Sequence, residues 1–135
     1  MRKHLAILHK SAIDAILSGT KLIETRFSKA KIVPFGAVSI GDLVYMKAPG
    51  EEIIGQFRVK KVFFFEGLDE KDVEKIFTDY GQQISVGSQA EDEDYFRQKR
   101  DSKYGTLIFI GESERFITSP IRFKKSDMRG WVVLE

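Results

Sequence analysis

Apolar and polar residues alternate along the chain mainly with the two-residue period of β-strands, and the strands are short. Many turn signals separate them and few helices intervene, so we expect a small, mostly antiparallel barrel, because closure removes exposed sheet edges. The strands are predicted at "HLAIL" (4–8), "KLIETRF" (21–27), "DLVYMKA" (42–48), "IIGQFRVKKVFFFEG" (53–67), "YGTLIFIGES" (104–113), "ERFITSPIRF" (114–123) and "GWVVLE" (130–135).

Three stretches carry the helical period instead. Ser11 is predicted to cap the first helix, and Gly19 to end it in a left-handed conformation. Asp69 is predicted to cap the second helix and Gly81 to end it. A third, weaker helix is predicted to follow Ser88. The fold class is therefore mostly β with inserted helices, or α+β.

The amino-acid composition is typical of an ordinary globular domain. The 135 residues show no repeat and no linker, so residues 1–135 are expected to form one domain. The sequence has no apolar run near the roughly 20 residues that span a bilayer and no signal-peptide pattern. It has no cysteine, which excludes disulfides and thiolate chemistry. We therefore expect a cytoplasmic protein without membrane partners.

The sequence offers no metal or cofactor motif. Its histidines are His4 and His9, which lack a carboxylate partner at metal-binding spacing and are interpreted as ordinary surface or strand-end residues. Walker loops and nucleophile elbows are also missing. We expect neither metal nor cofactor.

The stretch "LSGTKLIETRF" (17–27) places charges inside an otherwise apolar run. On a strand, Glu24 and Arg26 point to one face, and Lys21 stands at the joint between helix and strand. A carboxylate between two cations stays ionised and orients both, and Arg26 could then offer its fork to a phosphate or a base edge. The alternative is a salt-bridge group that pins the helix to the barrel.

The spacing G-x-K-x-x-E-x-R, from Gly19 to Arg26, resembles the signature of the ASCH superfamily, whose small domains have a PUA-like β-barrel. Three later segments are similar to the family in the same order, so the resemblance covers about residues 4–124. It implies a charged cleft that binds RNA, a nucleotide or a nucleoside. These segments are "SIGDLVYM" (39–46), "EEIIGQFRVKKVFFF" (51–65) and "KYGTLIFIGE" (103–112).

One bacterial branch of the family removes the acetyl group from acetylcytidine with a Lys, a Thr and a Glu. Lys21 matches the lysine of that branch, but its threonine nucleophile falls on Glu24, and a carboxylate cannot simply replace a hydroxyl in acyl transfer. A small hydrolase, a nucleoside amidohydrolase or a ribonuclease, stays the alternative, with Lys21 or Glu24 as general base. An acyl-transfer enzyme would also need a hydroxyl near Lys21, which Thr20 or Thr25 could supply.

Two further residues are candidates for ligand binding beside Lys21, Glu24 and Arg26. Lys47 ends a predicted strand at the barrel rim, and Tyr104 follows the basic stretch "RQKRDSK" and could stack a base. Phe63–Phe65 and Trp131 are interpreted as core. A third interpretation is an interaction domain with no small ligand, and the sequence names no protein partner.

Overall fold

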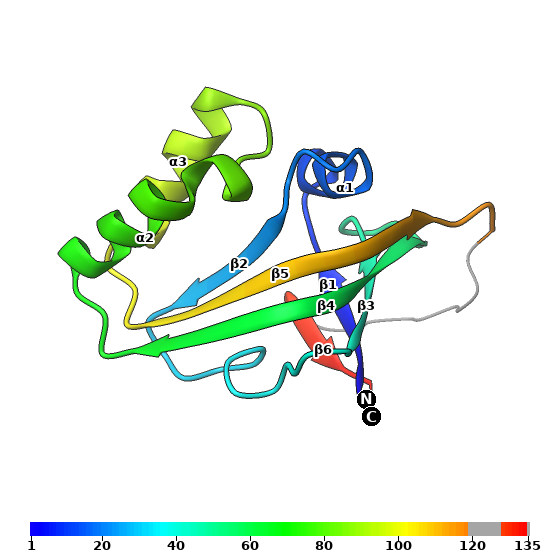
Figure 1. The fold of residues 1–135 in the computed structure, drawn as a ribbon, viewed down its shortest axis with the longest axis horizontal. Coiled ribbons are helices and arrows are strands. Elements are labelled where there is room, and N and C mark those ends of the chain that lie inside the picture. The colour runs from blue at the N-terminus through cyan, green and yellow to red at the C-terminus, as the bar shows by residue number, and fades with distance from the viewer. Residues whose placement is uncertain (119–127, 135) are drawn as a thin grey trace.

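The computed structural model describes residues 1–118 and 128–134. Six strands and three helices form in these residues (Figure 1). They are β1 (Lys3–Ile7), α1 (Lys10–Leu17), β2 (Ile23–Ser28), β3 (Leu43–Lys47), β4 (Ile53–Glu66), α2 (Glu70–Ile84), α3 (Gln89–Lys99), β5 (Tyr104–Arg115) and β6 (Trp131–Val133).

The strands form one curled sheet in the order β2-β5-β4-β3-β1-β6. The long pair β4 and β5 spans the molecule, and β1, β3 and β6 pass behind it (Figure 1). The pairing of β1 with β3 is parallel, whereas the other described pairings are antiparallel. The prediction of an α+β, PUA-like barrel is confirmed as a half-barrel, in which β2 and β6 are the end strands of the described sheet.

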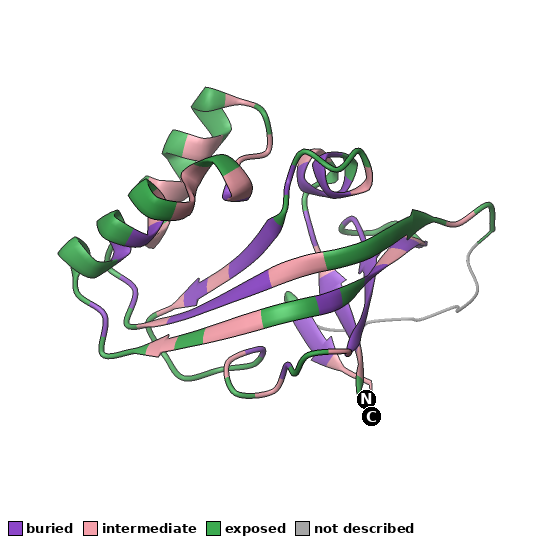
Figure 2. Cartoon of the chain, in the orientation of Figure 1, coloured by how far each residue is buried: buried purple, intermediate pink, exposed green. Residues whose placement is uncertain are grey.

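The half of the sheet built from β2, β5 and β4 separates two apolar cores because successive side chains point to opposite faces. The helix α1 packs into the core on the inner face, and α2 packs into the core on the outer face. Figure 2 shows that burial concentrates on the strands, while α2 and α3 carry exposed residues along their length. The inner core includes Ile13, Ile16, Phe57, Ile108 and Trp131, and the outer core includes Ile23, Phe27, Val73, Ile76 and Leu107.

The helix starts and ends follow the sequence only in part. Gly19 has φ 82° after the first helix, and Asp69 and Ser88 accept hydrogen bonds from the first turns of α2 and α3, as predicted. The cap of α1 is His9 rather than Ser11, which lies inside the helix. Gly81 does not end α2, because the helix continues to Ile84, whose buried side chain extends the outer core.

Two other segments differ from expectation, and part of one lies outside the described residues. Phe64 is 38% exposed and is therefore not a core residue, although Phe63 and Phe65 pack against the outer core. β5 runs on to Arg115, so the strand predicted at 114–123 does not begin separately, and its residues 119–123 lie outside the described residues. None of the described helices has the length and apolar character needed to cross a membrane.

Candidate functional site

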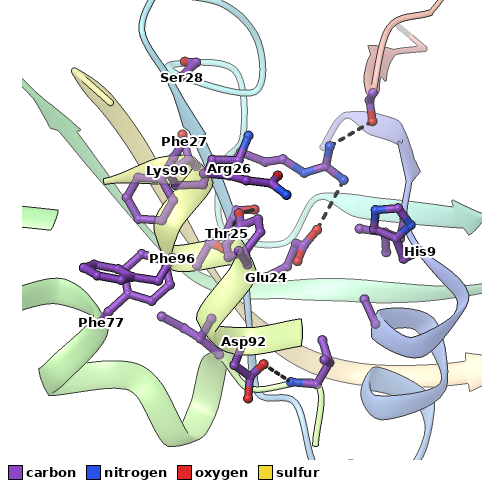
Figure 3. A pocket seen from close by; sticks show the side chains of 18 of the residues that line it. His9, Glu24, Thr25, Arg26, Phe27, Ser28, Phe77, Asp92, Phe96 and Lys99 are labelled. Carbon is purple, nitrogen blue, oxygen red and sulfur yellow. Dashed lines mark hydrogen bonds and ion pairs between the residues drawn. The ribbon is translucent and has the colours of Figure 1, made fainter. Parts of the chain in front are cut away.

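A pocket of about 790 Å³ opens where the edge strand β2 meets the helices (Figure 3). One wall comes from the end of β1 and the start of α1, and the other comes from α2 and α3. The loop after β2 and the start of β6 complete it. The lining combines charged and aromatic side chains, among them Lys21, Glu24, Arg26, Asp92, Tyr104 and Trp131.

Lys21, Glu24 and Arg26 meet on the floor of this pocket. The Lys21 Nζ lies 3.6 Å from the Glu24 Oε1, and the Arg26 Nη2 lies 3.2 Å from the Glu24 Oε2. Lys21 and Glu24 are buried, and Arg26 is half-buried. The backbone of Leu22 pairs with Gln83 on one side and with β5 on the other, and its side chain is turned outward, 48% exposed. In this stretch, therefore, the charged side chains of Lys21 and Glu24 are buried, whereas the apolar side chain of Leu22 is exposed.

Burial dominates the electrostatics of Lys21. Its ammonium donates a hydrogen bond to the backbone oxygen of Ile84, at the end of α2. Desolvation lowers the pKa of Lys21 below its ordinary value, although the carboxylates of Glu24 and Asp92 oppose the shift. Lys21 therefore gives up its proton more easily than an exposed lysine does.

The guanidinium of Arg26 spans the gap between the two end strands of the sheet. It donates hydrogen bonds to the backbone oxygens of Ile7 (2.9 Å) and Gly130 (3.1 Å), and it lies 5.3 Å from the ring centroid of Trp131. Figure 3 shows the guanidinium of Arg26 next to the carboxylate of Glu24. Arg26 therefore offers a fixed charge, because much of its fork is already bound to the protein.

A buried chain of hydrogen bonds supports Trp131 from behind. Its indole N–H donates to Nδ1 of His4 (3.1 Å), so the His4 proton lies on Nε2 and donates to Asp42 (2.8 Å). Desolvation raises the pKa of Asp42, but the hydrogen bonds from Arg2, His4 and Ser39 outweigh it and hold this pKa below its ordinary value. The sequence interpretation of His4 as a surface or strand-end residue is wrong, because His4 is fully buried.

The hydroxyls near Lys21 are engaged elsewhere. The Thr25 Oγ1 shares a 2.8 Å hydrogen bond with the hydroxyl of Tyr95, whose pKa rises to about 12, chiefly because of desolvation. The Thr20 hydroxyl donates to the backbone oxygen of Ala15, and Thr20 is not among the lining residues. Neither threonine is therefore poised beside the Lys21 amine.

Asp92 is a lining residue that sequence reasoning missed. Its Oδ1 accepts a hydrogen bond from the Val86 amide (3.0 Å; Figure 3), and its other oxygen accepts one from the Ser85 hydroxyl. These bonds tie the first turn of α3 to the segment after α2. The only signal in the sequence was the acidic first turn of the third helix, which is ordinary capping chemistry.

The two remaining sequence candidates have different outcomes. Tyr104 lines the pocket and packs edge-on against Phe35, with 5.2 Å between ring centroids. Lys47 is buried at the end of β3, where it donates to the backbone oxygen of Ala48, and it is not among the lining residues. His9, at the start of α1, does line the pocket. Within residues 1–118 and 128–134, no group of three or more His, Asp or Glu side chains is placed to hold a metal ion.

Solved structures with the same architecture come from proteins of low sequence identity. ASCH from Zymomonas mobilis is 18% identical with a TM-score of 0.61, over 84% of this chain and 70% of that one. A single-residue variant of that protein is 17% identical with a TM-score of 0.68, over 99% of this chain and 89% of that one. The hypothetical protein PH0355 is 19% identical with a TM-score of 0.54, over 86% of this chain and 100% of that one. No protein-family model and no curated protein sequence matches the chain. The chain has the fold of the ASCH domain structures.

Proposed function

We propose that the pocket binds a nucleotide, either free or as part of single-stranded RNA. The observation that carries this proposal is the buried group of Lys21, Glu24 and Arg26 on the floor of a pocket of about 790 Å³. That volume is within the range of small-molecule sites, which combine apolar walls with a few fixed polar groups. The resemblance of the signature spacing to the ASCH superfamily supports the same class of ligand.

The chemistry of the lining suits a base, a sugar and a phosphate. The carboxylates of Glu24 and Asp92 retain acceptor capacity for the amino group of a base, since an ionised carboxylate has about four lone-pair sites. Tyr104 and Phe35 offer aromatic surfaces for stacking. Lys99 lines the pocket at the end of α3 and can pair with a phosphate.

A hydrolase is the second candidate, and one observation favours it. Lys21 combines burial, a lowered pKa and a neighbouring carboxylate, which are the properties of a general base. Because the hydroxyls of Thr20 and Thr25 are engaged elsewhere, a water molecule activated by Lys21 is the nucleophile that fits best.

The test of binding is Glu24→Gln, which preserves shape and removes the charge. We expect the affinity for cytidine or adenosine monophosphate to fall about tenfold or more, because a hydrogen bond to a charged group is lost. Isothermal titration measures the affinity, and thermal unfolding measures the stability. Glu74→Gln, on the exposed side of α2, is the matched control. A lower melting temperature with unchanged binding would instead assign the three charges to pinning the helix.

Hydrolysis is tested separately. The wild-type protein is incubated with acetylcytidine and with a short RNA, and products are separated by chromatography. If the pocket is catalytic, Lys21→Met abolishes turnover, and wild-type turnover rises with pH as Lys21 loses its proton. Tight binding without product formation would leave the binding function and exclude hydrolysis of these two substrates.

A further inference from the structure

An aromatic cluster continues the pocket outward along the sheet. The Phe35 ring lies 5.4 Å from the Phe64 ring and 5.2 Å from the Tyr104 ring, in edge-on arrangements. We call Phe35, Phe64 and Tyr104 the aromatic ledge. Phe35 and Tyr104 also line the pocket, whereas Phe64 lies beyond it and is 38% exposed.

The strand register explains why the ledge and the charged floor are continuous. Thr106 of β5 stands opposite Arg26 on one side and opposite Phe64 on the other. Cross-strand partners share a face of the sheet, and so do residues two apart on one strand, which adds Tyr104 to that face. A ligand that leaves the pocket over Arg26 therefore meets Tyr104 and Phe64 next.

The loop after β2 adds exposed apolar surface to the same place. Ile32 is 58% exposed and Val33 is 44% exposed, and both line the pocket. Exposed apolar side chains that adjoin a pocket and aromatic rings are typical of a binding surface. The apolar surface therefore extends the pocket rather than lying isolated on the molecule.

Several lysines lie next to this surface. The Lys31 amine lies 5.7 Å from the centroid of Phe35, and Lys99 lines the pocket. Lys29 and Lys103 are exposed on the segments that flank the ledge, and Asp101 pairs with Lys29 at 2.9 Å. Aromatic faces among an excess of lysines complement a chain of bases joined by phosphates, because bases stack and phosphates pair with cations.

We propose that Phe64, the outer ring of the aromatic ledge, stacks the base next to the one that Tyr104 and Phe35 contact in the pocket. The ligand is then a single-stranded oligonucleotide of two or more nucleotides rather than a free nucleotide. This inference rests on the proposed function and specifies its substrate class. Recognition at the ledge tolerates any base, because every base has a face that can stack.

The test compares two probes, cytidine monophosphate and a six-nucleotide single-stranded RNA. We expect the wild-type protein to bind the RNA at least tenfold more tightly than the nucleotide. Phe64→Leu keeps an apolar side chain and removes the aromatic face, so its RNA affinity falls about tenfold while its nucleotide affinity is unchanged. Ile40→Ala, at a side chain that is 70% exposed and not among the lining residues, is the control and changes neither affinity.

A second variant keeps the test independent of any packing change at Phe64. Lys31→Ala removes an exposed cation, so the dependence of log affinity on log salt for the RNA becomes shallower by about one unit. Nucleotide binding by this variant is again unchanged.

Three outcomes overturn the proposal. Equal wild-type affinity for the nucleotide and the RNA would refute the binding role of the ledge but would leave the proposed nucleotide binding intact. A change in self-association of Phe64→Leu by sedimentation velocity, with RNA binding unchanged, would make the ledge an interface between copies of this chain. Failure of the wild-type protein to bind either probe would refute both the binding role of the ledge and the proposed function.

Discussion

Lys21 and Glu24 form a buried ion pair, and lysine and glutamate are rarely buried in proteins. Lys21 and Glu24 are buried 3.6 Å apart, and Arg26 approaches the glutamate from the other side. Desolvation of two such charges costs several kcal/mol, which their attraction repays only in part, so the pair is a weak source of stability. Their position on the floor of a pocket is therefore the basis on which we propose that these charges bind a ligand.

The lowered pKa of Lys21 predicts a pH dependence of stability. The unfolded chain binds this proton more tightly than the folded chain does, so the free energy of unfolding rises with pH between the lowered pKa and 10.5. Glu24 and Asp92 oppose the shift and Arg26 adds to it. Other groups titrate in the same range, so we compare wild type with Lys21→Met in urea. We expect wild type to gain stability relative to the variant as pH rises, and parallel curves would contradict a lowered pKa.

At the scale of elements, the helix α2 determines the back of the pocket. It passes through Gly81 and ends at Ile84, whose backbone oxygen receives the Lys21 ammonium. The following segment binds Asp92 and so fixes the start of α3. The length of α2 therefore positions both the cation and a carboxylate of the pocket.

Gly81→Ala tests whether α2 is a continuous helix through this position. Gly81 has no positive φ, and an added Cβ would meet no atom within 4 Å, so alanine is accommodated. We expect stability to rise by about 0.5–1 kcal/mol, because alanine loses less backbone entropy in a helix. Urea unfolding measures the change.

The matched control is Gly105→Ala in β5. An added Cβ there would lie 2.8 Å from the Phe27 ring, and we expect a loss of about 1–3 kcal/mol from overpacking. A loss at Gly81 as well would show that α2 does not tolerate a side chain on its pocket side.

For the molecule as a whole, the Arg26 side chain joins the two ends of the half-barrel. Arg26 on β2 donates to backbone oxygens at the end of β1 and just before β6, and its guanidinium lies over Trp131. Trp131 is in turn held by the buried His4 and Asp42. Arg26 therefore both lines the pocket and links the two ends of the half-barrel, so a substitution of Arg26 affects ligand binding and stability together.

Arg26→Ala should destabilise the fold as well as weaken binding. We expect a loss of about 2–4 kcal/mol, because charge-assisted hydrogen bonds are lost and Glu24 is left less well paired. Arg26→Lys should recover little of it, since an ammonium lacks the planar fork that reaches several acceptors. Thermal unfolding measures the stability, and hydrogen exchange should report faster opening of β6. Wild-type exchange at β6 in both variants would contradict the closing role.

Local sequence determined much of this protein by itself. The two-residue period predicted most strand positions, Gly19 marked a left-handed residue, and Asp69 and Ser88 marked helix starts, because these features depend on neighbours within a few residues. The strand period likewise placed Glu24 and Arg26 on one face, where the two side chains form an ion pair. Short-range geometry is sufficient for these conclusions.

Only the tertiary structure decided the partners that arrive from far along the chain. His4 meets Asp42 and Trp131, which are 38 and 127 residues away, and Arg26 meets Gly130, which is 104 residues away. The exclusion of Lys47 from the pocket and the exposure of Phe64 also depend on which strands are neighbours, including the parallel pairing of β1 with β3. The alternation of side chains predicts which residues share one face of a strand. It does not predict which segments pack against that face, because those segments come from distant parts of the chain.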